Sequence, residues 1–432
     1  MRPIDDATLT ALDGSRPADT VIVWAWRGGS LVLPEPLQVV DWSFADAAGD
    51  STKVGQQISL TIADPDGTLG AWRFDDPLGV GGTRLQVIYR VGGAGAINYG
   101  WYRITGNKPQ ELVDWRDIDE YGNDEPDSEL GPHRRRVPII TAVVRIDAVD
   151  LTDDLKRDRF EAPQSPDTGA SIISEFRRLT EDYFPTVVDP GVTDRGVSPF
   201  LILDGERLEA GQDLLSRINA RYRMGGDGEC HVYPLTTPVV LRVEPGKALV
   251  SVSREQTIDG LYNRWVVEGK DTVTGQPIVA AVELEYGPLR YGGDHGRVPF
   301  TYTSEMITTF QQALEYAREL RAKFLASLAV TLTVEIAPHP ELQADDRIEV
   351  GCPVAAGHVA YFPGTIATIR RAGSPVPTAN VLTVSCSYSD VTTALARTTW
   401  AGNLTRTMPE LTWDRMPATW GSVPPMTWDE LP

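Results

Sequence analysis

The chain reads ISLTIADPDGTLGAWRFDDPLGVGGTRLQVIYRV at residues 58–91, and this stretch shows the pattern that governs most of its length. Two short runs, QQISLTIADP (56–65) and TRLQVIYRV (83–91), alternate or run apolar, as β-strands do. Between them lies ADPDGTLG (63–70), a cluster with Pro and Gly at positions that favour turns. The stretch therefore predicts antiparallel strands joined by a turn-rich connection.

The same pattern recurs on both sides of this stretch, with Gly, Pro and Asp between short apolar runs. The further runs are VIVWAW (21–26), LQVVDWSF (37–44), YGWYRITG (99–106) and IITAVVRIDAVDL (139–151). Strands at this spacing are typical of an antiparallel β-barrel or β-sandwich. We predict that residues 1–160 form an N-terminal β domain.

A strongly charged segment interrupts this domain at ELVDWRDIDEYGNDEPDSELGPHRRRVP (111–138). Residues 111–129 hold nine acidic residues and one basic residue, Arg116, and an Arg triplet follows at 134–136. Crowded like charges repel one another and stay hydrated, so we expect a projecting, solvated loop. A charged contact with a partner subunit is the alternative.

Helical periodicity first occurs after this domain. SIISEFRRLTEDYF (171–184) and ERLEAGQDLLSRINARYRM (206–224) each place apolar residues on one stripe, and GECHVYPL (228–235) resembles a strand. We predict a small α/β domain over residues 161–240.

Strand-like runs then resume and surround the clearest helix of the chain, SEMITTFQQALEYARELRAKFLASL (304–328), which Ser304 is suited to cap. The surrounding runs are VVLRVE (239–244), NRWVVEGKD (263–271), IVAAVELEY (278–286), VTLTVEI (330–336), DRIEV (346–350) and NVLTVSCSYS (380–389). They predict a second β domain over residues 241–398, with helix 304–328 packed on it.

Residues 399–432 differ in kind, because four of the eleven tryptophans fall there between prolines: Trp400, Trp413, Trp420 and Trp428. LTWDRMP and MTWDELP are near-copies, and the prolines interrupt any long helix or strand. An extended arm cannot bury these rings against itself, so we expect it to bury them against another protein. An idle terminal tail is the alternative.

Length and charge narrow the class of protein. The chain has 432 residues, which suits about three domains, and its 40 Lys plus Arg against 60 Asp plus Glu give a formal charge of −20. A protein that grips duplex DNA needs a basic surface, which this balance opposes. Neither a secretory signal nor an apolar stretch of membrane-spanning length is visible, and three widely spaced cysteines predict buried thiols in a reducing cytoplasm.

The motifs of common enzyme sites are missing from the sequence. The five histidines form neither HExxH nor another metal-binding spacing, and GxSxG, GxxxxGK[ST] and a GxGxxG after a strand do not occur. Asp64 and Asp66 of DPDG, with Asp75 and Asp76, form the best cation candidate, but a turn explains them better. We therefore predict neither catalytic, cofactor-binding nor metal-binding residues, although paired carboxylates for glycoside hydrolysis stay open.

These motifs together resemble the tail-tip or baseplate hub proteins of tailed phages. The resemblance rests on DPDG, on Asp76-Pro77-Leu78, on GWYRITG (100–106) and on LYNRWVVEGKD (261–271). It continues through helix 304–328 into VTLTVEIAPHPELQADDRIEV, which has HPEL and DDR where the family usually has NP and GD. The terminal Trp-Asp repeats are similar to tails found in phages of actinobacteria.

The resemblance implies two tube-type β-barrels, a small α/β domain and the C-terminal arm. It also implies a homotrimeric ring that joins the sixfold tail tube to the threefold tip and lets DNA pass without holding it. The implied partners are a second copy, a distal tail protein, the tail tube or tape measure and other tail-tip proteins, without stable membrane insertion. The implied location is the tail tip of the virion, after synthesis in the host cytoplasm.

Two other functions stay open. The chain could be a tail-tip adhesin whose tryptophans stack on host surface carbohydrate, although adhesins place such rings on rigid strands or loops. It could also be a cell-wall hydrolase, but lysins of the family carry an added hydrolase domain, and 432 residues leave little room for one. We therefore expect a structural protein and not an enzyme.

Overall fold

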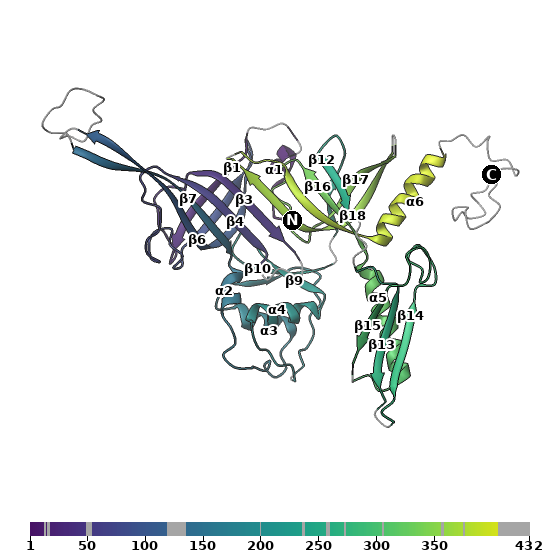
Figure 1. The fold of residues 1–432 in the computed structure, drawn as a ribbon. Helices are drawn as coiled ribbons and strands as arrows, with labels where there is room; N and C mark the ends of the chain where they lie inside the picture. Colours follow the sequence, from purple (N-terminus) through teal and green to yellow (C-terminus); the bar gives the residue numbers. More distant parts are fainter. Residues whose placement is uncertain are drawn as a thin grey trace.

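The computed structural model describes residues 1–404 apart from 13, 15–17, 49–53, 119–134, 199, 236–237, 256–259, 272–273, 305, 356–357 and 375. It consists of one large sheet with an α/β domain and a smaller insert domain on one side of it (Figure 1). The mainly β class predicted from the sequence is confirmed. Within the described residues, none of the helices is long and apolar enough to cross a membrane.

Within the described residues the large sheet has 13 strands, which come from residues 20–150 and from residues 239–387. Its N-terminal half follows helix α1 (Asp6–Leu12) and comprises β1 (Thr20–Arg27), β2 (Ser30–Leu31), β3 (Val39–Ala47), β4 (Gln56–Asp64), β5 (Arg84–Arg90), β6 (Ala96–Ile118) and β7 (Arg135–Asp150). Its C-terminal half comprises β11 (Val239–Val243), β12 (Leu249–Glu255), β16 (Ala329–Ile336), β17 (Arg347–Ala355), β18 (His358–Gly373) and β19 (Asn380–Ser387), and helix α6 (Tyr388–Leu404) follows it.

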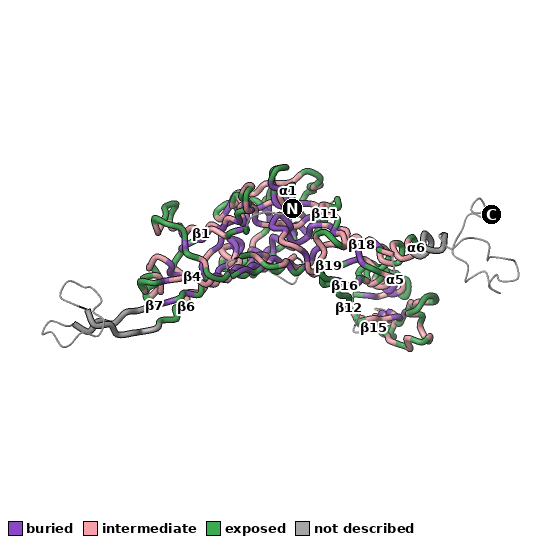
Figure 2. The backbone as a smooth tube through the Cα atoms, turned by 90° about the horizontal axis from the view of Figure 1, so that it is seen from above, coloured by how far each residue is buried: buried purple, intermediate pink, exposed green. Residues whose placement is uncertain are grey.

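Each half has its own hydrophobic core on one face of the sheet. Buried and less buried residues alternate along β4 and β19, because successive side chains of a strand point to opposite faces. Leu60 and Ile146 lie in the N-terminal core, and Val334 and Val384 lie in the C-terminal core. The buried backbone gathers in the middle of the molecule in Figure 2.

The two halves join edge to edge through β3 and β18, which run antiparallel from Thr368 opposite Ala47 to Gly373 opposite Trp42. Only a glycine fits at position 373, because a Cβ there would lie 2.6 Å from Nε1 of Trp42. Eleven of the 13 described strands thus pair along one path, β12-β16-β19-β18-β3-β4-β7-β6-β5-β1-β2, and β17 branches from β18 and pairs with β11, rather than forming two separately closed rings.

The charged segment 111–138 is only partly a loop, which corrects the prediction. β6 continues to Ile118 and β7 starts at Arg135, so the two strands form a long ribbon that projects from the sheet (Figure 1). The register pairs the backbone of Asp117 with that of Arg136. Residues 119–134 lie outside the described residues.

The α/β domain comprises α2 (Thr152–Arg157), α3 (Ile172–Thr180), β8 (Thr186–Val188), α4 (Arg207–Ser216), β9 (Ala220–Met224) and β10 (Cys230–Pro234). Its strands have the order β8-β10-β9 and share one core with the helices. The helix predicted over 206–224 ends at Ser216, because Asn219 turns the chain with φ 52° and residues 220–224 pair with β10.

The insert domain comprises β13 (Arg264–Lys270), β14 (Pro277–Glu283), β15 (Pro299–Thr303) and α5 (Phe310–Ser327). Helix α5 packs on this three-stranded sheet, with Ala313 and Ala317 against Val267 and Ala280, and not on the large sheet as we expected. It also starts later than residue 304. Thr309 is the N-cap, because its side chain accepts the backbone N–H of Gln312, whose own side chain accepts the N–H of Thr309.

The three cysteines, Cys230, Cys352 and Cys386, are buried and free, as the spacing predicted. Burial raises the pKa of Cys352 to about 11 and that of Cys386 to about 12, so these thiols are inert at neutral pH.

Candidate functional site: the buried junction of the domains

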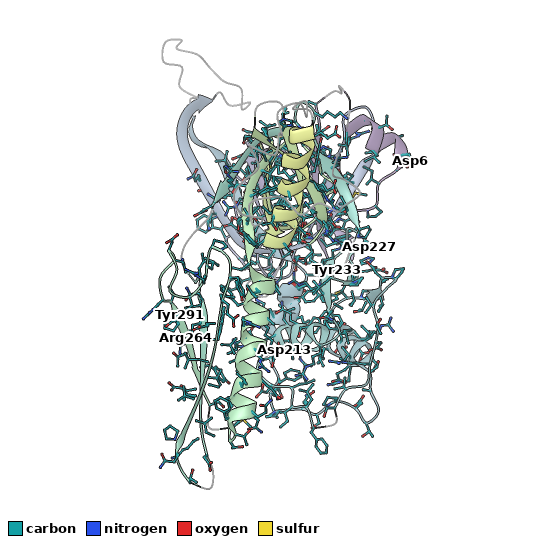
Figure 3. The ribbon with its side chains drawn as sticks, turned by 90° about the vertical axis from the view of Figure 1, so that its right-hand side faces the viewer. Asp6, Asp213, Asp227, Tyr233, Arg264 and Tyr291 are labelled. Atoms are coloured by element: carbon teal, nitrogen blue, oxygen red, sulfur yellow. The ribbon has the colours of Figure 1, made fainter. Side chains whose placement is uncertain are left out.

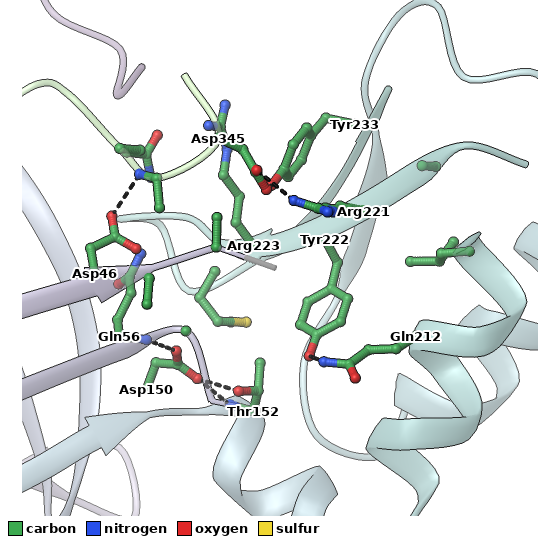
Figure 4. A pocket seen from close by; sticks show the side chains of 18 of the residues that line it. Asp46, Gln56, Asp150, Thr152, Gln212, Arg221, Tyr222, Arg223, Tyr233 and Asp345 are labelled. Carbon is green, nitrogen blue, oxygen red and sulfur yellow. Dashed lines mark hydrogen bonds and ion pairs between the residues drawn. The ribbon is translucent and has the colours of Figure 1, made fainter. Parts of the chain in front are cut away.

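Three parts of the molecule meet where β3 ends and β4 begins, beside β9 and β10 of the α/β domain and the segment 337–346 that links β16 to β17. A cavity of about 160 Å³ lies between them (Figure 4). Its lining includes Asp46 and Gln56 from the sheet, Tyr222 and Tyr233 from the α/β domain, and Asp345 from the linking segment.

Two arginines that interact with Asp46 are fully buried, although the sequence places them far apart, at residues 2 and 371. Arg2 donates from Nη1 to the carbonyl oxygen of Leu342 at 3.1 Å, and Arg371 donates from Nη2 to the same oxygen at 2.5 Å. Both guanidinium groups also lie over the ring of Tyr99, at 4.4 and 5.6 Å.

The carboxylate of Asp46 balances part of this positive charge. Complete burial raises its pKa, while Arg2 and Arg371 oppose that shift. It also accepts the backbone N–H of Ala344 at 3.2 Å, so it ties β3 to the linking segment. Nε and Nη2 of Arg2 and Nε and Nη1 of Arg371 find no hydrogen-bond partner among the described residues, so Asp46 and the aromatic rings beside the two arginines offset their charge only in part.

A second set of contacts fastens the α/β domain to the linking segment. Arg221 lies 2.6 Å from one oxygen of Asp345, and the hydroxyl of Tyr233 donates to the other oxygen at 2.6 Å. Arg223 lies 3.3 Å from Asp346 and over the ring of Tyr233. Tyr233 lies at the level where the α/β domain meets the large sheet (Figure 3).

Asp150, at the end of β7, closes the cavity from the side of the N-terminal half. It accepts the backbone N–H of Gln56 at 2.7 Å and that of Thr152 at 2.9 Å, and it also contacts the hydroxyl of Thr152. Burial raises its pKa to about 6, which these hydrogen bonds only partly offset.

This junction is suited to holding domains at fixed angles. Its carboxylates face guanidinium groups, backbone amides or hydroxyls. A network with partners on three domains resists their rotation, because any rotation would leave a buried charge uncompensated.

The cation candidate of the sequence is a set of turn contacts. Asp64 is buried and accepts the backbone N–H groups of Thr68 and Leu69, both at 2.9 Å. Asp76 likewise accepts those of Trp72 and Arg73, both at 2.7 Å. Both carboxylates therefore shape the loop between β4 and β5.

Of the four tryptophans predicted to bind a partner, the structure describes the backbone of Trp400 alone. The backbone of Trp400 belongs to helix α6, so the arm does not start as an extended segment at residue 399. Trp413, Trp420 and Trp428 lie outside the described residues. Their role stays a prediction.

Sequence reasoning missed the junction, although two signals were present. Arg371 follows Ile369 by two residues in ATIRRAG, so strand alternation places a charge on the buried face of β18. Arg221 and Arg223 also alternate along β9, which places both on one face of that strand.

No known protein family and no curated protein matches the sequence. Solved structures do share the fold. The tail protein of Neisseria meningitidis MC58 matches with a TM-score of 0.52 and 11% identity, over 85% of this chain and 96% of that one. The 43 kDa tail protein of prophage MuSo2 from Shewanella oneidensis matches with a TM-score of 0.53 and 12% identity, over 85% and 98%. A chain of the half-lidded Francisella PdpA–VgrG complex matches with a TM-score of 0.50 and 8% identity, over 88% and 60%. The chain therefore has the fold of phage tail proteins.

Proposed function

We propose that the chain is a structural hub of a phage tail tip or baseplate. The observation that carries this proposal is the single sheet formed by both halves across β3 and β18, in a fold shared with nearly the full length of two tail proteins. In this proposal each half acts as one tube-type β-barrel unit when copies assemble.

Three copies would place six such units around an axis, so a threefold ring would match a sixfold tube. Ring closure needs a constant angle between the two halves, because a heterologous contact that does not close gives an open helix. The buried junction supports this requirement, since Arg2, Asp46 and Arg371 link both halves.

The sheet also offers a surface that suits passing DNA. One face carries small hydroxyl residues across both halves, with Ser43 opposite Ser59 in the N-terminal half and Thr333 opposite Thr383 in the C-terminal half, and it also carries the exposed Arg145 and Arg370. Hydroxyls hold phosphate weakly, and the net charge of −20 opposes retention of DNA. We infer that this face lines the lumen and that DNA passes it without stable binding.

The C-terminal arm, residues 399–432, suggests the remaining partners. We infer that Trp400, Trp413, Trp420 and Trp428 dock on a neighbouring copy, on the distal tail protein or on another tail-tip protein, and that the chain resides at the tail tip of the virion. Regularly spaced aromatic residues are effective anchors at protein interfaces.

Electron microscopy of the concentrated protein tests the hub. Threefold rings with six similar lobes around a central channel are expected. Particles without rotational symmetry, both alone and with a tail-tube protein added, would contradict the proposal. Deletion of residues 399–432 should leave the fold unchanged and abolish binding to the protein on which the arm docks.

A carbohydrate-binding adhesin is a second candidate, because one observation favours it. Trp72 and Phe74 are 87% and 76% exposed on the loop between β4 and β5. That loop is held by Asp76 and by Arg27, which donates to the carbonyl oxygens of Asp75 and Asp76 at 2.5 Å.

Sedimentation with purified cell walls distinguishes the hub, the adhesin and a cell-wall hydrolase. The adhesin requires binding that Trp72→Ala abolishes, the hub requires none, and a hydrolase would reduce wall turbidity.

A further inference from the structure

Two buried arginines, Arg2 and Arg371, lie so close together in the core that their guanidinium groups share one acceptor. Both donate to the carbonyl oxygen of Leu342, at 3.1 and 2.5 Å, and both lie over the ring of Phe44, at 5.6 and 5.4 Å. Each arginine is only 2% exposed. Like charges this close repel each other strongly where the dielectric constant is low, so the pair requires compensation from its surroundings.

The nearby carboxylates do not bind either guanidinium group directly. Asp46 accepts a backbone N–H of the linking segment at 3.2 Å, and Oε1 of Glu341 lies 2.9 Å from Nδ1 of His339. In the part of the chain that the structure describes, neither carboxylate forms a hydrogen bond or an ion pair with Arg2 or Arg371. The carboxylates therefore act on the two arginines only through longer-range attraction.

The buried atoms left without a partner at this place are mostly donors. Among the described residues they are Nε and Nη2 of Arg2, Nε and Nη1 of Arg371, the hydroxyl of Tyr99 and Oε2 of Glu341. Guanidinium nitrogens can only donate, a hydroxyl can donate or accept, and a carboxylate oxygen accepts. Because nearly all buried polar groups in folded proteins have a partner, this excess of donors indicates a further acceptor in the core.

An anion meets this requirement better than water does. A water molecule brings as many donors as acceptor sites, so it cannot remove an excess of donors. An anion accepts from several N–H groups at once, and hydrogen bonds between charged groups are the stronger ones. It would also offset the repulsion between the two guanidinium charges, which supply the compensation that a buried anion needs.

The surroundings favour a small anion with one charge. The rings of Phe44 and Tyr99, each 1% exposed, lie against the two arginines and are mostly apolar. A larger oxyanion with two charges, such as sulfate, would lose more hydration on entering this core than chloride does. We infer that one small monovalent anion, for which chloride is the probe, binds between Arg2 and Arg371. The site goes beyond the hub proposal and does not depend on ring formation.

A bound anion would act on the join between the two halves of the sheet. Arg371 belongs to β18 and Phe44 to β3, the two strands that pair across this join, and Arg2 contacts the linking segment through Leu342. Release of the anion would leave the two guanidinium charges to repel each other beside the join. The folded chain should therefore bind chloride, whereas the unfolded chain, in which the arginines are apart, should not.

Urea unfolding of the full chain at several chloride concentrations tests the site, with sodium gluconate, whose anion is far larger, keeping the ionic strength constant. A ligand that binds only the folded state raises the folding equilibrium constant in proportion to its concentration above Kd, so a rise approaching tenfold is expected between about 20 and 200 mM chloride. Arg371→Met should lose this response. Arg370→Met is the matched control and should retain it, because Arg370 is exposed.

A crystal grown in bromide provides a second readout, which decides the question if Arg371→Met fails to fold. An anomalous peak in contact with nitrogens of both arginines is expected. Three results would overturn the site: a folding constant that does not change with chloride in the unsubstituted chain, a chloride response of equal size in Arg371→Met, or ordered water in place of a bromide peak between the two arginines.

Discussion

Arg370 and Arg371 are neighbours in the chain but lie on opposite faces of β18, exposed and buried respectively. Arg371→Met should destabilise the chain by about 3 kcal/mol, because it leaves the buried Asp46 with less compensating charge. Arg370→Met is the matched control and should change stability by less than about 0.5 kcal/mol. Urea unfolding followed by tryptophan fluorescence measures both. Equal losses in the two variants would refute the role given to the buried arginine.

Because its carboxyl is buried, Asp150 should make the stability of the protein decrease as pH rises. Its pKa of about 6 in the folded state lies above the unfolded value of about 4, so the folded state binds more protons between these values. Stability should therefore fall by about 1 kcal/mol as pH rises from about 5 to 7.5.

Asp150→Asn should remove this contribution, whereas Asp66→Asn, at an exposed position, should retain it. Urea unfolding at the two pH values measures the difference. A pH dependence that is identical in Asp150→Asn and in the unsubstituted chain would show that this carboxyl does not titrate in the folded protein.

Among the secondary-structure elements, the N-cap of α5 allows a test of what stabilises the insert domain. Thr309→Ala removes the observed N-cap and should destabilise the helix by about 1 kcal/mol. Ser304→Ala removes the cap that the sequence suggested, and it should have a smaller effect because the helix starts six residues later. Hydrogen exchange of the α5 amides reports this local stability directly. A larger effect at Ser304 than at Thr309 would contradict the observed start.

The sequence located individual strands better than their partners. Alternation along β4 or β5 is local, so short apolar runs and turn residues were sufficient to find them. The pairing of β3 with β18 joins segments far apart in the chain, and neither segment contains a signal for its partner. The crowded like charges of residues 111–129 favour a loop, but the backbone of β6 and β7 pairs as far as Ile118 opposite Arg135.

The candidate site was harder to predict than the strands, for a related reason. Arg2, Asp46 and Asp345 have no spacing in the sequence that brings them together, and only the packing of three domains does so. Arginine and aspartate side chains are also mostly exposed in folded proteins, so a sequence gives little reason to expect them in a core. A local signal was available in the alternation of Arg221 and Arg223 along β9, but charged residues with this spacing are more common on hydrated surfaces.

At the scale of the whole molecule, the net charge predicts weak contact with DNA. Fluorescence anisotropy with a labelled duplex at physiological salt should show no saturable binding, because −20 per chain repels phosphate. A bovine serum albumin sample, also acidic, serves as the control for non-specific signal. Saturable binding that weakens steeply with added salt would contradict passage without retention.

The central claim is that copies of this chain close into a threefold ring, and molar mass measures it most directly. Light scattering after size-exclusion chromatography at increasing loading concentrations should show a shift toward three times 47.3 kDa. Assembly should weaken in Arg371→Met, which loosens the angle between the two sheet halves, but not in Arg370→Met. A chain that stays at 47.3 kDa at every concentration and with a tail-tube protein added, or that forms closed dimers, would contradict the account.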